Sequence, residues 1–375
     1  MLIGGALEAG NKNIYDAILE ARDGDGPVCV IPTAGASPRE SMASAVNRID
    51  HWGGDGTAHG ILITVSAPDR AFDPEVVEEI RGCSGFFFTG GVQARISRVF
   101  LPKGEMTPVY HAVLERYREG AVVSGSSAGA SIMSDPMISG GTSEDAFSGG
   151  VVGANGTDGV QLLQGMGLIR GIPIDQHFLA RGRIGRLMTV VLEEEDVSHG
   201  LGIDENTALV VRNGRGRVVG ASGVIWVDGS RAHYPSSSSA RLAAEGLVVE
   251  LLGEGDEIDM NTGSVTPAAG KERLGAVSPL ASRRDTSRDE QLDRLFNRWV
   301  FLHVLNGMAT DGGADRSVEV EGHRIQLRGG DGFRGVAWPE RGVRGTPYGL
   351  SVGPIEVDIL GPRPQSSASR PGGRR

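Results

Sequence analysis

Cysteine is nearly absent from this sequence of 375 residues, which contains only Cys29 and Cys83. Each of the two lies inside an apolar run, PVCVIPTAG and RGCSGFFFTGG respectively. A disulfide framework or a metal site built from several thiolates needs more cysteines than this. We therefore expect two buried thiols, no disulfide framework and no cysteine-ligated metal.

Long hydrophobic runs and an excess of basic residues are also missing. No apolar run approaches the roughly 20 residues that a membrane-spanning helix requires, and the opening MLIGGALEAG lacks the basic segment and long apolar core of a secretory signal. Acidic residues outnumber basic residues by 47 to 37, so the formal net charge of −10 opposes nonspecific binding to nucleic acid or acidic membranes. These absences predict a cytoplasmic protein without a nucleic-acid or membrane partner.

The composition that remains is that of a globular protein. Apolar residues make up 39% and charged residues 22% of the chain, which is enough to bury a large core. Glycine is abundant, with 58 residues. So many glycines indicate tight turns and places where the backbone approaches another group closely.

Short apolar runs alternate with amphipathic segments in the first part of the chain. This alternation is typical of parallel strands joined by helices. The strand-like runs are LIGG, PVCVIPTAG, HGILITVS, GFFFTGG and AVVSG, and the helix-like segments are PRESMASAVNRIDHW, PEVVEEIRG, QARISRVF and VYHAVLERYREG. The pattern predicts an α/β fold with a doubly wound, mostly parallel sheet, in which sites lie at the carboxyl ends of the strands.

The later part of the chain predicts further strands and an extension. GLGIDENTALVV is expected to be one strand, and GRVVGASGVIWVD to be an arm of a hairpin. We expect a catalytic α/β domain over residues 1–280. A small helix and β appendage would follow over 281–360, beginning with a charged linker at Arg283 and a helix with apolar positions at Leu292, Leu295, Phe296, Val300 and Leu302. Residues 361–375 are rich in Pro, Gly, Ser and Arg and predict a disordered tail.

The run GSSAGAS follows the predicted strand AVVSG directly, so that Ser127 is the central residue of a G-x-S-x-G pattern. Between a strand and a helix, this pattern is typical of a nucleophile elbow, because a tight turn projects the hydroxyl away from the sheet. The helix that follows would also direct backbone N–H groups at a developing oxyanion. A glycine-rich N-cap or a phosphate-binding turn is the structural alternative, although the run lacks the lysine of a Walker motif.

A second glycine element, FTGGVQ, ends the preceding strand. Because neighbouring parallel strands end side by side, the N–H groups of Gly91 and Ala128 are candidates for a two-donor oxyanion hole. An ordinary strand-to-helix turn would have the same glycines.

His177 stands out among the eight histidines because GIPIDQHF is an apolar strand that ends in polar residues. A lone histidine is more often structural, but beside a serine elbow His177 becomes a candidate general base. Such a base needs a third group to fix its tautomer, and Asp204 and Glu205 in GIDEN are the best candidates. With Glu205 the order is Ser, His, acid, which differs from the order in ordinary α/β-hydrolases.

The motifs FTGGVQ, GSSAGAS, DQHFLARGRIGRL and GIDENTA, in this order along the chain, resemble those of the cyanophycinases, which are peptidase E-like serine hydrolases of peptidase family S51. The resemblance covers roughly residues 1–280. It implies a core similar to the class I glutamine amidotransferase fold, which is flavodoxin-like. It also implies Ser127 as nucleophile, His177 as base and Glu205 as orienting acid, with Gly91 and Ala128 supplying the oxyanion N–H groups. The implied substrate-binding residues are Gln93, Asp175, Gln176, Arg181, Arg183 and Arg186.

The substrate that the resemblance implies is cyanophycin, a polyaspartate backbone with an arginine on each side-chain carboxyl. Arg181 and Arg183 suit the arginyl carboxylates, since a guanidinium grips a carboxylate with two hydrogen bonds. Asp175 and the two glutamines would accept from guanidinium groups. A surface ion pair remains the alternative for Arg186.

The expected function is hydrolysis of cyanophycin to β-Asp-Arg through an acyl-enzyme, by a homodimer without a cofactor or metal. A peptidase E-like dipeptidase or exopeptidase for short aspartyl peptides is the nearest alternative, and a noncatalytic binding protein on the same scaffold is another. The three-arginine run favours the longer substrate.

Overall fold

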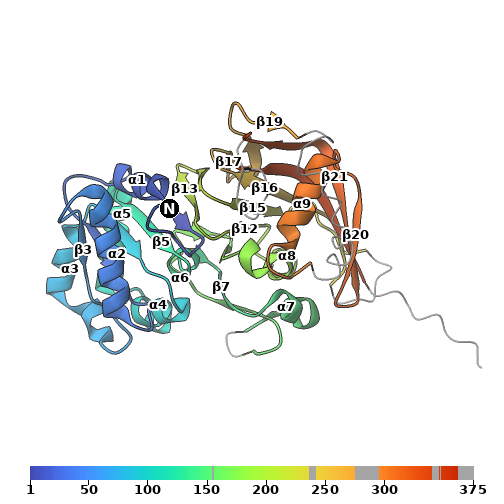
Figure 1. Cartoon of the computed structure of the whole chain (residues 1–375). Coiled ribbons are helices and arrows are strands. Elements are labelled where there is room, and N and C mark those ends of the chain that lie inside the picture. The colour runs from blue at the N-terminus through green and yellow to red at the C-terminus, as the bar shows by residue number, and fades with distance from the viewer. Residues whose placement is uncertain (154–155, 236–241, 275–294, 340–345, 347, 362–375) are drawn as a thin grey trace, which may run out of the picture.

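The structure is a computed structural model that describes residues 1–153, 156–235, 242–274, 295–339, 346 and 348–361. It is a mixed α/β protein with two large sheets, as Figure 1 shows. The first sheet and its helices come mainly from the N-terminal half of the chain. The second sheet comes mainly from the C-terminal half.

The first sheet has a parallel part and an antiparallel arm. The parallel strands, in spatial order, are β3 (Ala58–Gly60), β2 (Val28–Ile31), β4 (Gly85–Phe88), β5 (Val122–Ser126) and β1 (Leu2–Ile3). The arm continues with the antiparallel strands β13 (Thr207–Arg212), β14 (Arg215–Gly220), β17 (Glu257–Asp259) and β18 (Ser264–Thr266). The parallel strands β2 and β4 are buried along their whole length, which explains their continuous apolar sequences.

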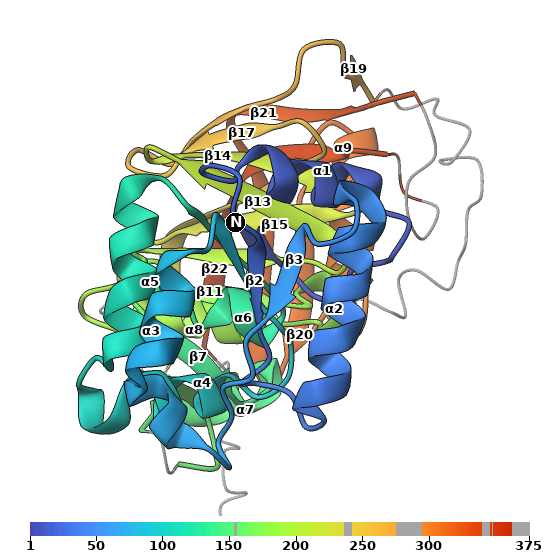
Figure 2. The ribbon, with the colours of Figure 1, turned by 90° about the vertical axis from the view of Figure 1, so that its left-hand side faces the viewer.

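Helices cover both faces of the parallel strands. Figure 2 shows α1 (Lys12–Glu20) and α2 (Pro38–Gly53) on one face. The opposite face carries α3 (Pro74–Arg81), α4 (Gln93–Phe100) and α5 (Pro108–Glu119), together with the short helices η1 (Pro68–Phe72) and η2 (Pro102–Gly104). The alternation of strands and helices predicted from the sequence is confirmed in this region.

The second sheet begins with a parallel pair, β11 (Ile174–Gln176) and β12 (His199–Ile203), and is otherwise antiparallel. It continues through β15 (Gly223–Asp228), β16 (Ala244–Gly253), β22 (Ser351–Leu360), β21 (His323–Ala337) and β19 (Glu272–Arg273), with β20 (Arg316–Val320) paired to β21. Helix α8 (Ile184–Glu193) packs on β12 and β15, and α9 (Val300–Thr310) packs on β21 and β22.

Smaller elements connect the two sheets. Residues 128–181 form α6 (Ala128–Ser131), β6 (Ser134–Asp135), β7 (Met137–Gly140), α7 (Ser143–Gly149), β8 (Val151–Val152), β9 (Val160–Leu163), β10 (Ile169–Arg170) and η3 (Leu179–Arg181). Strands β7, β9 and β8 make a separate small sheet, and β6 pairs with β10.

Two predictions about the middle of the chain were wrong. GLGIDENTALVV is two strands, β12 and β13, which belong to different sheets. GRVVGASGVIWVD is not a single hairpin arm: β14 forms a hairpin with β13, whereas β15 lies in the second sheet beside β12 and β16. Turns with left-handed backbone at Asn206 (φ 53°) and Gly220 (φ 127°) separate the strands of each pair. Because these turns redirect the chain, it passes from the second sheet to the first and back again.

The C-terminal extension is an integral part of the second sheet, so its description as a small appendage was also wrong. Strand β22 pairs with β16, and one hydrophobic core contains residues from Ile138 to Ile359. The helix begins later than predicted: Leu295 and Phe296 precede α9, although both are buried. The predicted boundary at 280, the linker at Arg283, Leu292 and the tail over 362–375 lie outside the described residues.

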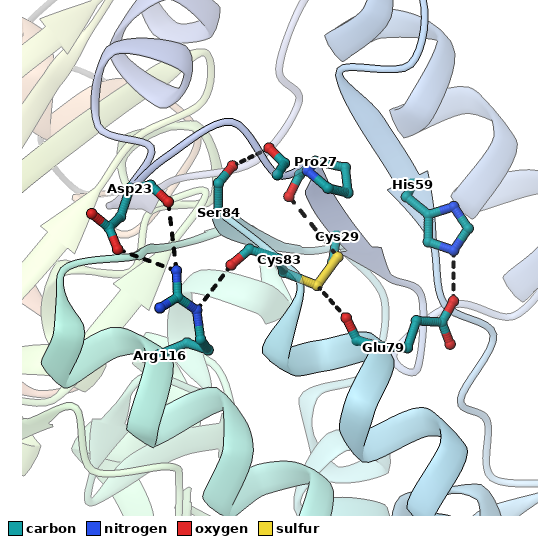
Figure 3. The surroundings of a disulfide bond; sticks show 9 residues. Asp23, Pro27, Cys29, His59, Glu79, Cys83, Ser84 and Arg116 are labelled. Carbon is teal, nitrogen blue, oxygen red and sulfur yellow. Dashed lines mark hydrogen bonds and ion pairs between the residues drawn. A yellow bond between two sulfur atoms is a disulfide. The ribbon is translucent and has the colours of Figure 1, made fainter.

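The expectation of two free thiols was wrong, because Cys29 and Cys83 form a disulfide. Figure 3 shows the bond linking strand β2 to the segment after α3. The two cysteines are 54 residues apart in sequence but close in space, since β2 and β4 are neighbouring strands. Arg116 on α5 fixes the Cys83 end, donating to its carbonyl at 3.1 Å and to the Asp23 carboxylate at 3.2 Å. Two cysteines in separate apolar runs gave no sign of this adjacency.

Candidate active site

Ser127 occupies a sharp turn between β5 and α6. Its backbone has φ 57° and ψ −115°, and its N–H donates to the Ile3 carbonyl at 2.8 Å. The flanking glycines leave no room for a side chain: a methyl group at Gly125 would lie 2.2 Å from the Gly129 carbonyl oxygen, and one at Gly129 would lie 2.1 Å from that of Phe88. This is the strained strand-to-helix turn that the G-x-S-x-G pattern predicts.

The structure brings Ser127, His177 and Glu205 into one hydrogen-bonded chain. Ser127 Oγ lies 2.9 Å from His177 Nε2, and His177 Nδ1 lies 2.7 Å from Glu205 Oε1. With the proton on Nδ1, the imidazole donates to Glu205 and leaves Nε2 free to accept the serine proton. Gln176 Oε1 is a second acceptor for the Ser127 hydroxyl, at 3.3 Å.

Asp204 and Glu205, both candidates for the acidic residue, have different surroundings. Asp204 is fully buried and accepts from Ala180 N–H at 2.9 Å and from the Ser222 hydroxyl at 2.6 Å. Burial raises the pKa of Asp204 to about 6. Asp204 therefore anchors the segment after His177, and only Glu205 touches the imidazole.

Three consecutive carbonyls at the end of β1 hold the segments that carry these residues. Ile3 accepts from Ser127 N–H at 2.8 Å, Gly4 from His177 N–H at 2.7 Å, and Gly5 from Asn206 N–H, next to Glu205, at 2.8 Å. Sequence reasoning identified LIGG only as a strand and missed this role. The signal that could have found it is the glycine pair, where the backbone must approach other groups closely.

Gly5 also lies directly against the histidine ring. Its φ is 106°, and a methyl group there would lie 2.4 Å from His177 Cε1 and Nε2. The Gly4 position is equally restricted, since a methyl group would lie 2.0 Å from the Asp204 carbonyl oxygen. Gly5 is therefore required for the observed position of the imidazole, and Gly4 for the close approach of the end of β1 to the Ile203–Asp204 backbone.

The surroundings of His177 favour the neutral imidazole. Burial lowers the pKa of His177, and the positive charges of Arg181 and Arg183 lower it further, while Glu205 acts in the opposite direction. The net shift is downward from the ordinary value. At neutral pH the imidazole is therefore ready to accept a proton.

The FTGGVQ element lies beside Ser127, as the sequence predicts. A methyl group at Gly90 would lie 3.2 Å from Ser127 Cβ, and Gly91 has φ 145° and packs against the Ala34 carbonyl. Ala128 begins α6, so its N–H belongs to the first turn of that helix. Gln93 is buried and donates to the Ile138 carbonyl at 2.9 Å, which ties α4 to β7.

The arginines of the DQHFLARGRIGRL segment have separate environments. Arg186 and Asp175 are both buried and bind each other, with Arg186 Nε 2.6 Å from Asp175 Oδ2, and Arg186 also donates to the Gly141 carbonyl. Burial by itself raises the pKa of Asp175, but Arg186 and Arg183 outweigh it, and the pKa falls below its ordinary value. Arg183 is mostly buried and donates to the Gln176 carbonyl and to Asp175. The structure therefore does not bring Asp175 and Arg186 to an open surface.

Arg181 is exposed, unlike its two neighbours. It lies near enough to His177 to lower the pKa of that residue. Of the three arginines, Arg181 is the exposed one, whereas Arg183 and Arg186 are mostly buried.

A cleft of about 430 Å³ opens on another side of Ser127. Its lining comes from the β1–α1 loop, α1, α2 and the ends of β4 and β5: Ala6, Leu7, Glu8, Tyr15, Ser41, Ser44, Ala45, Arg48, Ile49, Phe87, Thr89, Gly90, Ser126 and Ser127. We call it the α1–α2 cleft. The sequence did not predict it, because Tyr15, Ser41, Ser44 and Arg48 lie in helices without a motif and meet the two motif segments only in the folded chain.

The described residues contain no group of three or more His, Cys, Asp or Glu side chains arranged to hold a metal ion. In the same part of the chain, no helix is long and apolar enough to cross a membrane.

Residues 1–219 match the model of Peptidase family S51. A cyanophycinase from Nostoc sp. (strain PCC 7120 / SAG 25.82 / UTEX 2576) is 29% identical over 247 residues, which are 64% of this chain and 78% of the relative. A cyanophycinase from Geminocystis herdmanii (strain PCC 6308) is 28% identical over 270 residues, 70% of this chain and 93% of the relative. The crystal structure of a peptidase from an acI-B1 Actinobacterium is 22% identical, with a TM-score of 0.45, and the match covers 61% of this chain and 89% of that one. The chain therefore belongs to peptidase family S51 and is a serine-type peptidase.

Proposed function

We propose that this peptidase degrades cyanophycin and releases β-Asp-Arg dipeptides through an acyl-enzyme on Ser127. The observation that carries the proposal is the chain of hydrogen bonds from Ser127 through His177 to Glu205. The relatives named cyanophycinase support the choice of substrate.

The reaction begins with transfer of the Ser127 proton to His177 Nε2. Ser127 Oγ then attacks a backbone carbonyl of the polymer, and the N–H groups of Gly91 and Ala128 stabilise the oxyanion. The imidazolium is stabilised by Glu205 and returns its proton to the leaving amine. In the second half of the reaction, water attacks the acyl-enzyme with His177 again acting as the base.

In this proposal Arg181 binds a carboxylate of the substrate. Arg183 and the Gln176 side chain border the same site, while Asp175, Arg186 and Gln93 position backbone around it through the contacts described above. Arg186 and Asp175 thus act as positioning residues rather than as direct substrate contacts.

The finer fold and assembly also belong to this proposal. Parallel strands with helices on both faces support a doubly wound core of the class I glutamine amidotransferase type. The homodimer remains a prediction from the resemblance. The cytoplasmic location also remains a prediction, and the Cys29–Cys83 bond weighs against it, because disulfides persist mainly in oxidising compartments.

A dipeptidase or exopeptidase for short aspartyl peptides is the second candidate. The observation that favours it is the engagement of Arg186, and largely of Arg183, inside the protein. A single accessible arginine makes a simpler carboxylate clamp than a run of three. The complete Ser127–His177–Glu205 chain argues against a noncatalytic scaffold.

The deciding experiment incubates the protein and its Ser127→Ala variant with insoluble cyanophycin and identifies soluble products by mass spectrometry. Release of β-Asp-Arg by the parent and not by the variant is the expected result. Intact polymer together with hydrolysis of short aspartyl peptides would instead select the dipeptidase. Thermal unfolding of both proteins controls for a folding defect.

A further inference from the structure

The α1–α2 cleft reaches the candidate nucleophile from a side that the DQHFLARGRIGRL segment does not occupy. Ser126, Ser127 and Gly90 form its inner wall, and no described residue of 175–186 contributes to the lining. A peptidase must hold the peptide on both sides of the bond that it cleaves. In the proposed function Arg181 binds the substrate on one side of Ser127. The α1–α2 cleft offers space for the substrate on another side of Ser127.

Two polar side chains in this cleft lack a hydrogen-bond partner. The Tyr15 hydroxyl and the Thr89 hydroxyl are both buried, and neither has a described residue in hydrogen-bonding geometry, although the Arg48 guanidinium is near enough to Tyr15 to lower its pKa. Leaving buried polar groups unpaired is unfavourable, and each such group in a folded protein calls for an explanation. Since both residues line the cleft, a bound ligand would supply the missing partner.

Arg48 adds a positive charge beside these hydroxyls. It projects from α2, donates to the Leu7 carbonyl at 3.0 Å and is exposed. Its guanidinium is close to Tyr15: burial raises the pKa of the tyrosine, and Arg48 counteracts part of the rise. A guanidinium with four further N–H donors next to a hydroxyl is suited to a carboxylate.

We propose that the α1–α2 cleft is a second substrate subsite, in which Arg48 and Tyr15 bind a carboxylate of an aspartyl-arginine unit adjacent to the scissile bond. The proposal rests on the proposed role of Ser127 and assigns a substrate contact that the sequence motifs do not include. Glu8, on the same lining, gives the cleft a negative charge as well. The cleft thereby suits a zwitterionic peptide that carries both carboxylate and guanidinium groups.

The test measures binding of β-Asp-Arg by calorimetry to the full-length Ser127→Ala protein, so that no turnover occurs. The same measurement is made after adding Arg48→Met, Tyr15→Phe or Arg39→Met. Arg39 is the matched control, because it is an exposed arginine on the same helix outside the cleft. Loss of a charge-assisted hydrogen bond at an exposed site predicts that Arg48→Met raises Kd about tenfold. Tyr15→Phe should raise it less, and Arg39→Met should leave it unchanged.

The two mono-amides of β-Asp-Arg identify the carboxylate. The mono-amide that lacks the carboxylate bound by Arg48 should bind weakly to the Ser127→Ala protein. Adding Arg48→Met should then not raise the Kd of this mono-amide further. If Arg48→Met does not raise Kd for β-Asp-Arg more than Arg39→Met does, or if both mono-amides stay as sensitive to Arg48→Met as the parent dipeptide, the proposal is wrong.

A parallel assay of cyanophycin hydrolysis by the unmutated protein separates this proposal from the proposed function. Polymer hydrolysis with a Kd that does not depend on Arg48 would overturn the subsite and leave the function standing. An Arg48-dependent Kd without polymer hydrolysis would support the subsite and overturn the function.

Discussion

The two sheets contribute different parts of the candidate site. The first sheet supplies Ser127 at the carboxyl end of β5, within its parallel part. The glycines that follow the neighbouring strand β4 lie beside Ser127. The second sheet supplies His177 immediately after β11, and Glu205 lies in the turn where the chain passes from β12 to β13. The candidate nucleophile and its candidate base therefore come from different sheets.

Such a division makes the site depend on the junction between the sheets. The exit of β1 is that junction, because its three carbonyls bind the backbone of the Ser127, His177 and Glu205 segments. The first sheet is also cross-linked by Cys29–Cys83, whereas the second relies on buried ion pairs such as Asp175–Arg186. Variants can test each half of this comparison separately.

The largest effect is expected at the turn between the sheets. Glu205→Gln replaces a carboxylate, which can only accept, by an amide whose NH2 group can donate to His177 Nδ1. The imidazole proton then moves to Nε2, and a protonated Nε2 cannot accept the proton of Ser127. We expect kcat/KM to fall about 10³- to 10⁴-fold with the fold retained. Asp204→Asn is the control, because Asp204 does not touch the imidazole and its loss should act on stability. Equal loss of activity in both folded variants would contradict the assignment of Glu205.

In the second sheet, Arg186→Met should destabilise the protein by about 3–5 kcal/mol, because it leaves the Asp175 carboxylate buried without its main partner. Arg181→Met, on the exposed arginine, should change the free energy of unfolding by less than about 0.5 kcal/mol. Denaturant unfolding measures both. Similar values for the two variants would show that Arg186 is not the internal partner of Asp175.

In the first sheet, the double variant Cys29→Ser, Cys83→Ser should lower the free energy of unfolding by about 2–4 kcal/mol, since the bond closes a loop of 54 residues. Reductant should bring the parent protein to the stability of the variant. A titration that finds two free thiols in the native protein would show that the bond does not form.

At the junction, Gly5→Ala should lower kcat/KM about 100-fold, because the methyl group displaces the His177 ring. The matched control is Gly54→Ala at the end of α2. Gly54 has a similar positive φ of 93°, but a methyl group there meets nothing within 4 Å. If the control loses as much activity as Gly5→Ala, backbone strain rather than the ring contact is responsible.

The smallest effect concerns the pH dependence of the base. Because the pKa of His177 lies below its ordinary value of 6.5, the imidazole stays neutral and kcat/KM should persist below pH 6.5. Arg181→Met removes a positive charge that lowers this pKa, so the acid limb of the profile should move to higher pH. Arg39→Met should leave the limb in place. A shift to lower pH in Arg181→Met would contradict the electrostatic account.

Local motifs predicted much of this molecule. Most of the parallel strands, helices α2 to α5 and the serine elbow follow from residues close together in sequence, and the structure has them where the patterns placed them. Helix α1 was not predicted, and β3 is shorter than the predicted strand HGILITVS. The pairing of strands that are far apart in the sequence could not be predicted from these local patterns. The strand pattern could not show that β12 and β13 belong to different sheets, or that β22 pairs with β16, because strands of equal apolar character can pair in several ways.

The sequence by itself determined the type of chemistry: a serine in a strained turn, a histidine at a strand end and a carboxylate after the next strand. The residues alone left Asp204 and Glu205 open until the resemblance pointed to Glu205, and the tertiary structure shows that Glu205 contacts the imidazole. Only the tertiary structure distinguished Arg181, Arg183 and Arg186. Adjacent residues of the same charge look alike in sequence, yet burial and partners differ for each one. The Cys29–Cys83 bond and the α1–α2 cleft have the same origin, since both arise where segments far apart in the chain pack together and no local pattern records that contact.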